Sequence, residues 1–174
     1  MIIPRGFYSG DPIAVARSLV GAYLCVDAKR ARICELELYL ENDRACHAHR
    51  GRTERNAPMF LAGGHAYVYL CYGLHNLFNV VIGDENTPRA VLIRALEATE
   101  CNGPAKLTKV FGITREHNGL DLTVGKKLWL EPRSAEPKIA VGRRIGVDYA
   151  GPDAELPYRF GIKDSPFLSR PIRR

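Results

Sequence analysis

The sequence lacks any apolar stretch long enough to cross a membrane, since such a helix needs about 18 consecutive apolar residues. The N-terminal segment MIIPRGFYSGD also lacks the extended apolar region of a secretory signal peptide. We therefore expect a cytoplasmic protein, lying with the nucleoid if the source is a prokaryote. The length of 174 residues fits one domain that can bury a substantial core.

Cysteine is scarce and unpatterned. The five cysteines are odd in number and form no C-x-x-C pair, which argues against a disulfide framework or a structural zinc site. We expect them to be reduced thiols that pack as small apolar groups. They are Cys25, Cys34, Cys46, Cys71 and Cys101.

Acidic residues are in deficit. The chain has 25 Lys and Arg against 19 Asp and Glu, a formal net charge of +6 and a pI near 9.2. Of the basic residues 18 are Arg, whose guanidinium binds phosphate in a two-pronged geometry that Lys cannot match. The balance favours a polyanionic partner but says nothing about the fold.

The hydrophobic pattern predicts two helices and several strands. One helix begins at Asp11-Pro12 and stops at Gly21, and a second begins at Asn102-Gly-Pro and ends at Gly112. A long Arg-rich connection spans 41–64. The predicted strands are 33–40, 66–72, 78–82 and 90–96, with 73–76 as a hairpin tip. With no repeats or linker, we expect a single α+β domain over residues 1–174, built around a mostly antiparallel sheet.

The strand at 33–40 has an apolar back and an acidic front. Leu36 and Leu38 point to one face, and Glu35 and Glu37 point to the other. A partly desolvated carboxylate in such a place can act as a general base. The alternative is a pair of solvated charges on an exposed face.

The segment Cys46-His47-Ala48-His49 leaves a metal-dependent hydrolase open as an alternative. His47 and His49 would share a face if this segment were extended. No cysteine or acidic ligand recurs elsewhere at a matching spacing, which counts against a metal site. His47 is equally compatible with a polar pocket residue or a surface residue.

Aromatic and basic residues lie close together in the chain. Tyr67, Tyr69 and Tyr72 crowd one predicted strand and its end, a pattern compatible with base stacking or with an aromatic core stripe. Arg94 lies inside an apolar strand and needs an acceptor to avoid a large desolvation cost. Glu37 is a candidate partner.

Several motifs together resemble the alkyladenine (3-methyladenine) DNA glycosylase family. They occur in the family's order and span nearly the whole chain. They are Glu35-Leu-Glu-Leu-Tyr39, the segments 50–60 and 65–73, 90–97, Asn102-Gly-Pro-Ala-Lys-Leu107, Arg144-Ile-Gly146 and 165–170.

The resemblance implies a fold and a chemistry. The family fold is a single α+β domain, with a curved sheet, flanking helices and a protruding hairpin that inserts into DNA. By motif, Glu37 is the general base and Arg94 holds the attacking water with it. The backbone carbonyl of Ile145 matches a further contact to that water. The reaction releases alkylated or deaminated purines, the class of 3-methyladenine, 7-methylguanine, hypoxanthine and ethenoadenine, and leaves an abasic site.

The resemblance also assigns the residues that handle DNA. Tyr39, His47 and Tyr69 match the pocket for a base flipped out of the duplex, and Asn79 matches the residue that crowds the guanine amino group. Tyr72 matches the wedge that fills the vacated stack. The candidates for contact with the DNA backbone are Arg52, Lys106, Arg143 and Arg144.

The expected partner is double-stranded DNA with a damaged purine, bound by a monomer that needs no metal and no cofactor. No lysine in the matched motifs is placed to form a Schiff base, so hydrolysis without strand cleavage is expected. The chain departs from the family's usual pattern at Cys46 and His49. A non-catalytic nucleic-acid-binding protein remains a further alternative, in which Glu37 has no chemical role. Glu35→Gln is expected to affect the reaction much less than Glu37→Gln.

Overall fold

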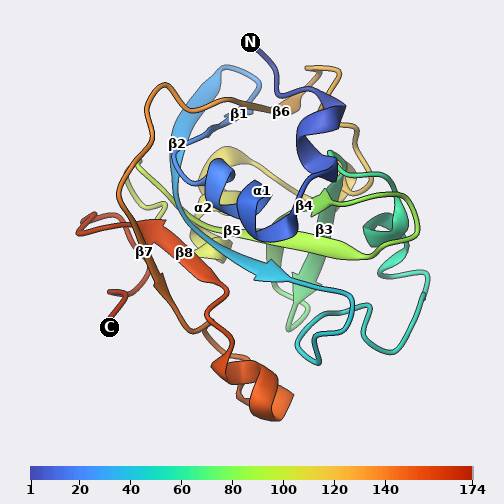
Figure 1. Cartoon of the computed structure of the whole chain (residues 1–174). Coiled ribbons are helices and arrows are strands. Elements are labelled where there is room, and N and C mark those ends of the chain that lie inside the picture. Colours follow the sequence, from blue (N-terminus) through green and yellow to red (C-terminus); the bar gives the residue numbers. More distant parts are fainter. Residues whose placement is uncertain (174) are drawn as a thin grey trace.

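The structure, a computed structural model, describes residues 1–173 (Figure 1). Over these residues the chain forms eight strands, two α-helices and four 3-10 helices. The strands are β1 (Tyr23–Val26), β2 (Lys29–Tyr39), β3 (Ala66–Cys71), β4 (His75–Ile82), β5 (Arg89–Leu96), β6 (Leu128–Glu131), β7 (Ile139–Gly142) and β8 (Arg159–Ile162). The helices are α1 (Pro12–Leu19), α2 (Pro104–Phe111), η1 (Arg5–Ser9), η2 (Ala57–Phe60), η3 (Arg115–His117) and η4 (Asp148–Glu155).

The long strand β2 organises a curved antiparallel sheet, in which the order is β3-β4-β5-β2-β1-β6. The first part of β2 pairs with β1, and its last part pairs with β5 on one side and β8 on the other. Register shifts between Ile33 and Leu36 bend the strand where its partners change. The expected α+β fold with a curved, antiparallel sheet is confirmed (Figure 1).

One face of the sheet carries the main apolar core. Alternate residues of the central strands point into it, among them Leu36, Val68 and Phe78. Helices α1 and α2 pack on this face and contribute to the same core. The Asp11 side chain caps α1 by accepting from the Ala14 N–H (2.8 Å), and α2 ends at Gly112 in the left-handed conformation, at φ 72°.

The opposite face carries polar and aromatic residues in a row across four strands. Tyr67 on β3 lies opposite Asn79 on β4, Asn79 lies opposite Leu92 on β5, and Leu92 lies opposite Glu37 on β2. Strand pairing therefore brings together residues that are up to 55 positions apart in the chain. On this polar face lies a pocket lined by several aromatic side chains.

Both predicted helices and all four predicted strands are present, with small shifts at their ends. The first helix stops at Leu19 rather than Gly21. The hairpin tip is shorter than predicted, because β4 already begins at His75. Strands β1, β6, β7 and β8 were not predicted. They are four residues each, and their signal is diluted by neighbouring Pro, Gly and charged residues.

Among residues 1–173, no helix is both long and apolar enough to pass through a membrane.

Candidate active site

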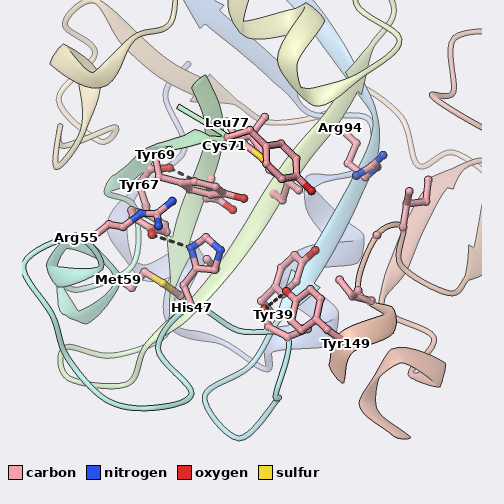
Figure 2. Close-up of a pocket in the computed structure, with 18 residues that line it drawn as sticks. Tyr39, His47, Arg55, Met59, Tyr67, Tyr69, Cys71, Leu77, Arg94 and Tyr149 are labelled. Atoms are coloured by element: carbon pink, nitrogen blue, oxygen red, sulfur yellow. Dashed lines mark hydrogen bonds between the residues drawn. The ribbon is translucent and has the colours of Figure 1, made fainter. Parts of the chain in front are cut away.

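A cavity of about 360 Å³ opens on the polar face of the sheet, a volume typical of a site for a small organic group. It brings together residues from β2, β3, β4 and β5, the connection after β2 and the segment that follows β7 (Figure 2). Every predicted base-pocket residue lines it, together with the predicted wedge and two predicted water-holding residues. These are Tyr39, His47, Tyr69, Asn79, Tyr72, Arg94 and Ile145.

Two sides of the cavity are built from aromatic rings. His47 packs edge-on against Tyr69, with 4.4 Å between ring centres, and its Nδ1 lies 2.9 Å from the Tyr67 hydroxyl. Tyr39 and Tyr149 lie across the cavity from this group (Figure 2). Flat rings on two sides form a slot suited to a flat aromatic ligand, because stacked rings gain dispersion and electrostatic energy.

Asn79 is fixed in the cavity wall. It is buried in the middle of the polar face, and its Nδ2 donates to the Tyr67 backbone carbonyl (3.1 Å). Asn79 lies within β4, four residues after its first residue, so it does not close the hairpin turn. A rigidly held amide at this position sets the size of the ligand that the cavity accepts.

Glu37 lies behind the cavity wall with none of its surface exposed. Its Oε2 accepts from the Tyr39 hydroxyl (2.7 Å), and its Oε1 accepts from the Ile145 N–H (2.7 Å). The Arg94 guanidinium lies 3.5 Å from Oε1. The Glu37 carboxylate therefore touches three residues that line the cavity, and Ile145 meets it through its N–H.

Burial controls the protonation of these groups. Desolvation raises the pKa of Glu37 above its ordinary value, although Arg94, the Ile145 N–H and the Tyr39 hydroxyl oppose the shift. Desolvation, the Glu37 charge and the hydrogen bond to Glu37 raise the pKa of Tyr39. Desolvation, aided by the Arg55 charge, lowers the pKa of His47. A carboxylate with a raised pKa beside a cleft is suited to general-base chemistry.

Glu35 has a different environment from Glu37, although both are buried. Its Oε1 accepts from Arg94 Nε (3.0 Å), Arg159 Nε (2.8 Å) and Ser169 Oγ (2.7 Å), and its Oε2 accepts from the Ser169 N–H (2.5 Å). Arg94, predicted to pair with Glu37, makes its closest ion pair with Glu35. Solvated charges on an exposed face are excluded for both glutamates.

These contacts revise the expectation that Glu35→Gln has little effect. The neutral amide that replaces the Glu35 carboxylate cannot balance the charges of the Arg94 and Arg159 guanidinium groups. We therefore expect the free energy of unfolding of Glu35→Gln to fall by about 3–5 kcal/mol. Arg94 should lose its anchor at the same time, and activity should fall with it. Denaturant unfolding of Glu35→Gln measures the first effect. The control is Glu97→Gln, whose half-exposed pair with Arg32 (3.6 Å) contributes about 1 kcal/mol or less. Equal stability of the two variants would contradict this role for Glu35.

Tyr72 projects from the tip of the β3–β4 hairpin beside the cavity. Its side chain is 92% exposed, and so it is not a core residue. Tyr72 and Gly73 both have positive φ, 51° and 67°, in a turn closed by the Leu74 N–H and the Cys71 carbonyl (3.1 Å). Positive φ is unfavourable for a bulky side chain. This turn therefore holds a strained, outward-pointing ring at the edge of the cavity.

The four candidates for contact with the DNA backbone lie in different environments. Arg52 and Lys106 are exposed, and Arg143 is exposed and paired with Glu155 (2.7 Å). Arg144 is 5% exposed and is bound to Asp43, the Leu38 carbonyl and the Asp153 carbonyl. This burial on internal acceptors argues against the predicted contact of Arg144 with DNA. The charge of Arg144 is used inside the protein, where it anchors the turn that carries Ile145.

Two of the three residues of the alternative metal site have other partners. His47 is bonded to Tyr67, and the Cys46 sulfur lies 4.0 Å from the Pro88 carbonyl. Over residues 1–173, no group of three or more His, Cys, Asp or Glu side chains is arranged to hold a metal ion. All five cysteines are free.

Some cavity residues had no assigned role in the sequence. Tyr67 shares the face of Tyr69 by simple alternation, a signal that could have identified it. Arg55, which donates to the Leu70 carbonyl (2.9 Å), and Tyr149, on the irregular helix η4, carry no periodic signal. Only the folding of distant segments brings these two residues to the cavity.

Comparison with known proteins now decides the family. The sequence model of the methylpurine-DNA glycosylase family matches residues 6–166. The chain belongs to the methylpurine-DNA glycosylase family. Among its relatives, proteins of Methanocella arvoryzae and Carboxydothermus hydrogenoformans are each 43% identical to it, over 97% and 98% of this chain and 96% and 100% of their own lengths. Each bears the name "Putative 3-methyladenine DNA glycosylase", as does a protein of Myxococcus xanthus, also 43% identical over 97% of this chain and 93% of its own length.

As a member of this family, the protein is a DNA glycosylase of DNA repair, and DNA is its substrate. The expected identification is confirmed. A binding protein without catalytic function is thereby set aside. The cavity on the polar face, with its buried carboxylate, is the candidate active site of this glycosylase.

Proposed function

We propose that the protein releases damaged purines, of the 3-methyladenine class named for its relatives, from double-stranded DNA by hydrolysis. The observation that carries this proposal is the contact of the buried Glu37 carboxylate with three cavity-lining residues, Tyr39, Arg94 and Ile145. The damaged base leaves the duplex and enters the aromatic slot, because its glycosidic bond cannot be attacked within the stack. The protein acts as a monomer.

Hydrolysis proceeds by attack of water on the sugar carbon C1′. Glu37 takes a proton from the water, the water oxygen bonds to C1′, and the purine leaves with the electron pair of the broken C1′–N bond. The Glu37 carboxylate also stabilises the oxocarbenium character that develops on the sugar. No lysine is among the cavity-lining residues, which supports hydrolysis without a Schiff base or strand cleavage.

Entry of the water requires a local change, since Glu37 has no exposed surface in the free protein. Its Oε2 is held by the hydroxyl of Tyr39, whose ring also lines the slot. Stacking of a purine on this ring moves the hydroxyl and frees a lone pair of Oε2 for the water. Arg94 and the Ile145 N–H keep Oε1 in place.

A panel of duplexes tests this function directly. Each duplex carries one lesion, 3-methyladenine, 7-methylguanine, hypoxanthine or ethenoadenine, and alkali then cleaves any abasic site. Alkali-dependent cleavage at one or more lesions supports the proposal. Cleavage without alkali would indicate a lyase, and no release from any duplex would overturn the proposed function.

We expect phosphate contacts to dominate DNA binding, because the chain has a net charge of +6. The logarithm of the binding constant should fall linearly with the logarithm of salt concentration, by about 0.9 per phosphate contacted. Charge reversal at Arg52 or Arg143 should weaken binding to lesion-bearing and undamaged DNA alike. The same reversal at Arg17, an exposed residue of α1, is the control. A flat dependence on salt would show that the basic surface does not face DNA.

We expect Asn79→Ser to relax the exclusion of guanine. Serine is shorter and leaves room where Asn79 is held against the Tyr67 carbonyl. In the variant, the ratio of 7-methylguanine release to hypoxanthine release should rise by about 10-fold, an effect typical of a small change in pocket size. Single-turnover release from duplexes that differ only in the target purine measures the ratio. An unchanged ratio in a folded variant would leave Asn79 with a structural role alone.

A further inference from the structure

A second hollow lies along β3 and the hairpin tip and adjoins the active-site cavity. It has a volume of about 480 Å³. Along β3, Tyr67, Tyr69 and Cys71 line the active-site cavity, whereas Val68 and Leu70 do not. The hollow, which we call the β3 groove, is lined by Arg55, Val68, Tyr69, Leu70, Tyr72, Gly73 and Arg115, of which Arg55, Tyr69 and Tyr72 also line the active-site cavity.

Tyr72 belongs to both sites. Its exposed ring forms the edge of the active-site cavity and also the edge of the β3 groove. The two hollows therefore meet at the hairpin tip, where both include the Tyr72 ring. A ring inserted into a duplex has one strand on each side, so this arrangement provides a place for each strand.

The chemistry of the β3 groove fits a nucleic-acid backbone. Its lining combines the apolar Val68 and Leu70 with the two guanidinium groups of Arg55 and Arg115. Arg115 begins η3 and is exposed, and within residues 1–173 no carboxylate lies within ion-pairing distance of it. Arg55 is held by the Leu70 carbonyl and lies 5.5 Å from the centre of the Tyr69 ring. A guanidinium without a protein partner is available to a phosphate.

We propose that the β3 groove binds the undamaged strand, opposite the lesion, with Arg115 on one of its phosphates. This inference rests on the proposed function, in which the damaged base occupies the active-site cavity, together with the predicted role of Tyr72 as the wedge in the duplex. Contact with the second strand gives the enzyme a preference for duplex over single-stranded substrate that the active-site cavity alone does not supply. Arg115 is the clearer probe, because Arg55 lines both hollows.

The first test compares Arg115→Ala with the wild-type protein on the same lesion in duplex and single-stranded DNA. We expect binding to the duplex to weaken by about 5- to 10-fold and its salt slope to fall by about one, the loss of one phosphate contact. The ratio of duplex to single-strand affinity should fall accordingly. Arg17→Ala removes the same charge from α1, away from both hollows, and should leave that ratio unchanged.

The second test identifies the strand. Single methylphosphonates, which are uncharged, replace phosphates near the lesion on either strand of the duplex. On the undamaged strand, one such replacement should weaken wild-type binding but not the binding of Arg115→Ala. If the replacement that loses its effect in Arg115→Ala lies on the lesion strand instead, the proposal is overturned.

The two proposals fail in different ways. If the wild-type protein releases no lesion from either substrate, the proposed function fails. If it releases lesions while Arg115→Ala and Arg17→Ala keep equal duplex to single-strand ratios, only the role of the β3 groove fails.

Discussion

Glu37→Gln is expected to lower single-turnover base release by about 10²- to 10⁴-fold, the range typical of removing a general base. Binding of lesion-bearing DNA should change little, because the amide keeps the shape of the side chain. The carbonyl oxygen of the glutamine can accept from the Ile145 N–H. Its amide nitrogen can donate to the Tyr39 hydroxyl oxygen, whereas in the wild-type protein the Tyr39 hydroxyl donates to Glu37. Rapid mixing with excess enzyme separates release from binding.

A matched control makes the same substitution at a position outside the active site. Glu136 is a surface residue paired with Arg133, and Glu136→Gln should leave release unchanged. Near-normal base release by Glu37→Gln would show that Glu37 is not the general base of the reaction.

The raised pKa of Glu37 has consequences for both activity and stability. Glu37 acts as a base only when ionised, so release of hypoxanthine should rise with pH through its pKa. Stability should change with pH in the opposite direction. The folded protein keeps the Glu37 proton up to a higher pH than the unfolded chain, in which the pKa of Glu37 has its ordinary value of 4.5. The stability that this proton contributes is complete below about pH 4.5 and is lost as pH rises through the raised pKa.

Glutamine cannot ionise, so unfolding at several pH values checks this sign. Relative to wild type, the free energy of unfolding of Glu37→Gln should increase from pH 4.5 upward and then level off. A difference that stays constant over pH would show that the pKa of Glu37 is the same in the folded and unfolded states.

Tyr72→Ala is expected to weaken binding and base release on duplex substrate by about 10- to 100-fold, because the vacated stack is left unfilled. This range corresponds to the roughly 1–3 kcal/mol of one stacking contact. Release from a single-stranded lesion should fall much less, since no duplex has to be opened. The exposed ring contributes little to folding, so the melting temperature should not decrease.

Two further variants distinguish the contribution of the Tyr72 ring from that of the rest of the hairpin tip. Tyr72→Phe keeps the ring and should retain most activity. Leu74→Ala removes a neighbouring side chain that is 77% exposed and should have a smaller effect than Tyr72→Ala. Equal losses for Tyr72→Ala on duplex and single-stranded substrates would contradict the wedge.

The sequence by itself determined the family and most of the regular elements. Alternation along 35–40 placed Glu35 and Glu37 on one face and the leucines on the other, as β2 has them. The pattern did not indicate the register shifts that put Ile33 in the same core as Leu36. The cap at Asp11 and the stop at Gly112 likewise depend on neighbouring residues alone. Such signals are local, because each follows from the backbone geometry of one strand or one helix.

Only the tertiary structure decided which polar residues act in the site and which hold the fold. Glu35 and Glu37 are two positions apart and equally buried, yet one is saturated by Arg94, Arg159 and Ser169 while the other adjoins the cavity. Arg143 and Arg144 are adjacent, yet one is exposed and the other is buried on Asp43. The partners that saturate Glu35 (Arg94, Arg159 and Ser169) and the Asp43 carboxylate that holds Arg144 are more than 50 residues away in the chain, and strand register and the chain after β7 bring them close. No local pattern contains that information, because the cost of burying a charge depends on the groups that fold against it.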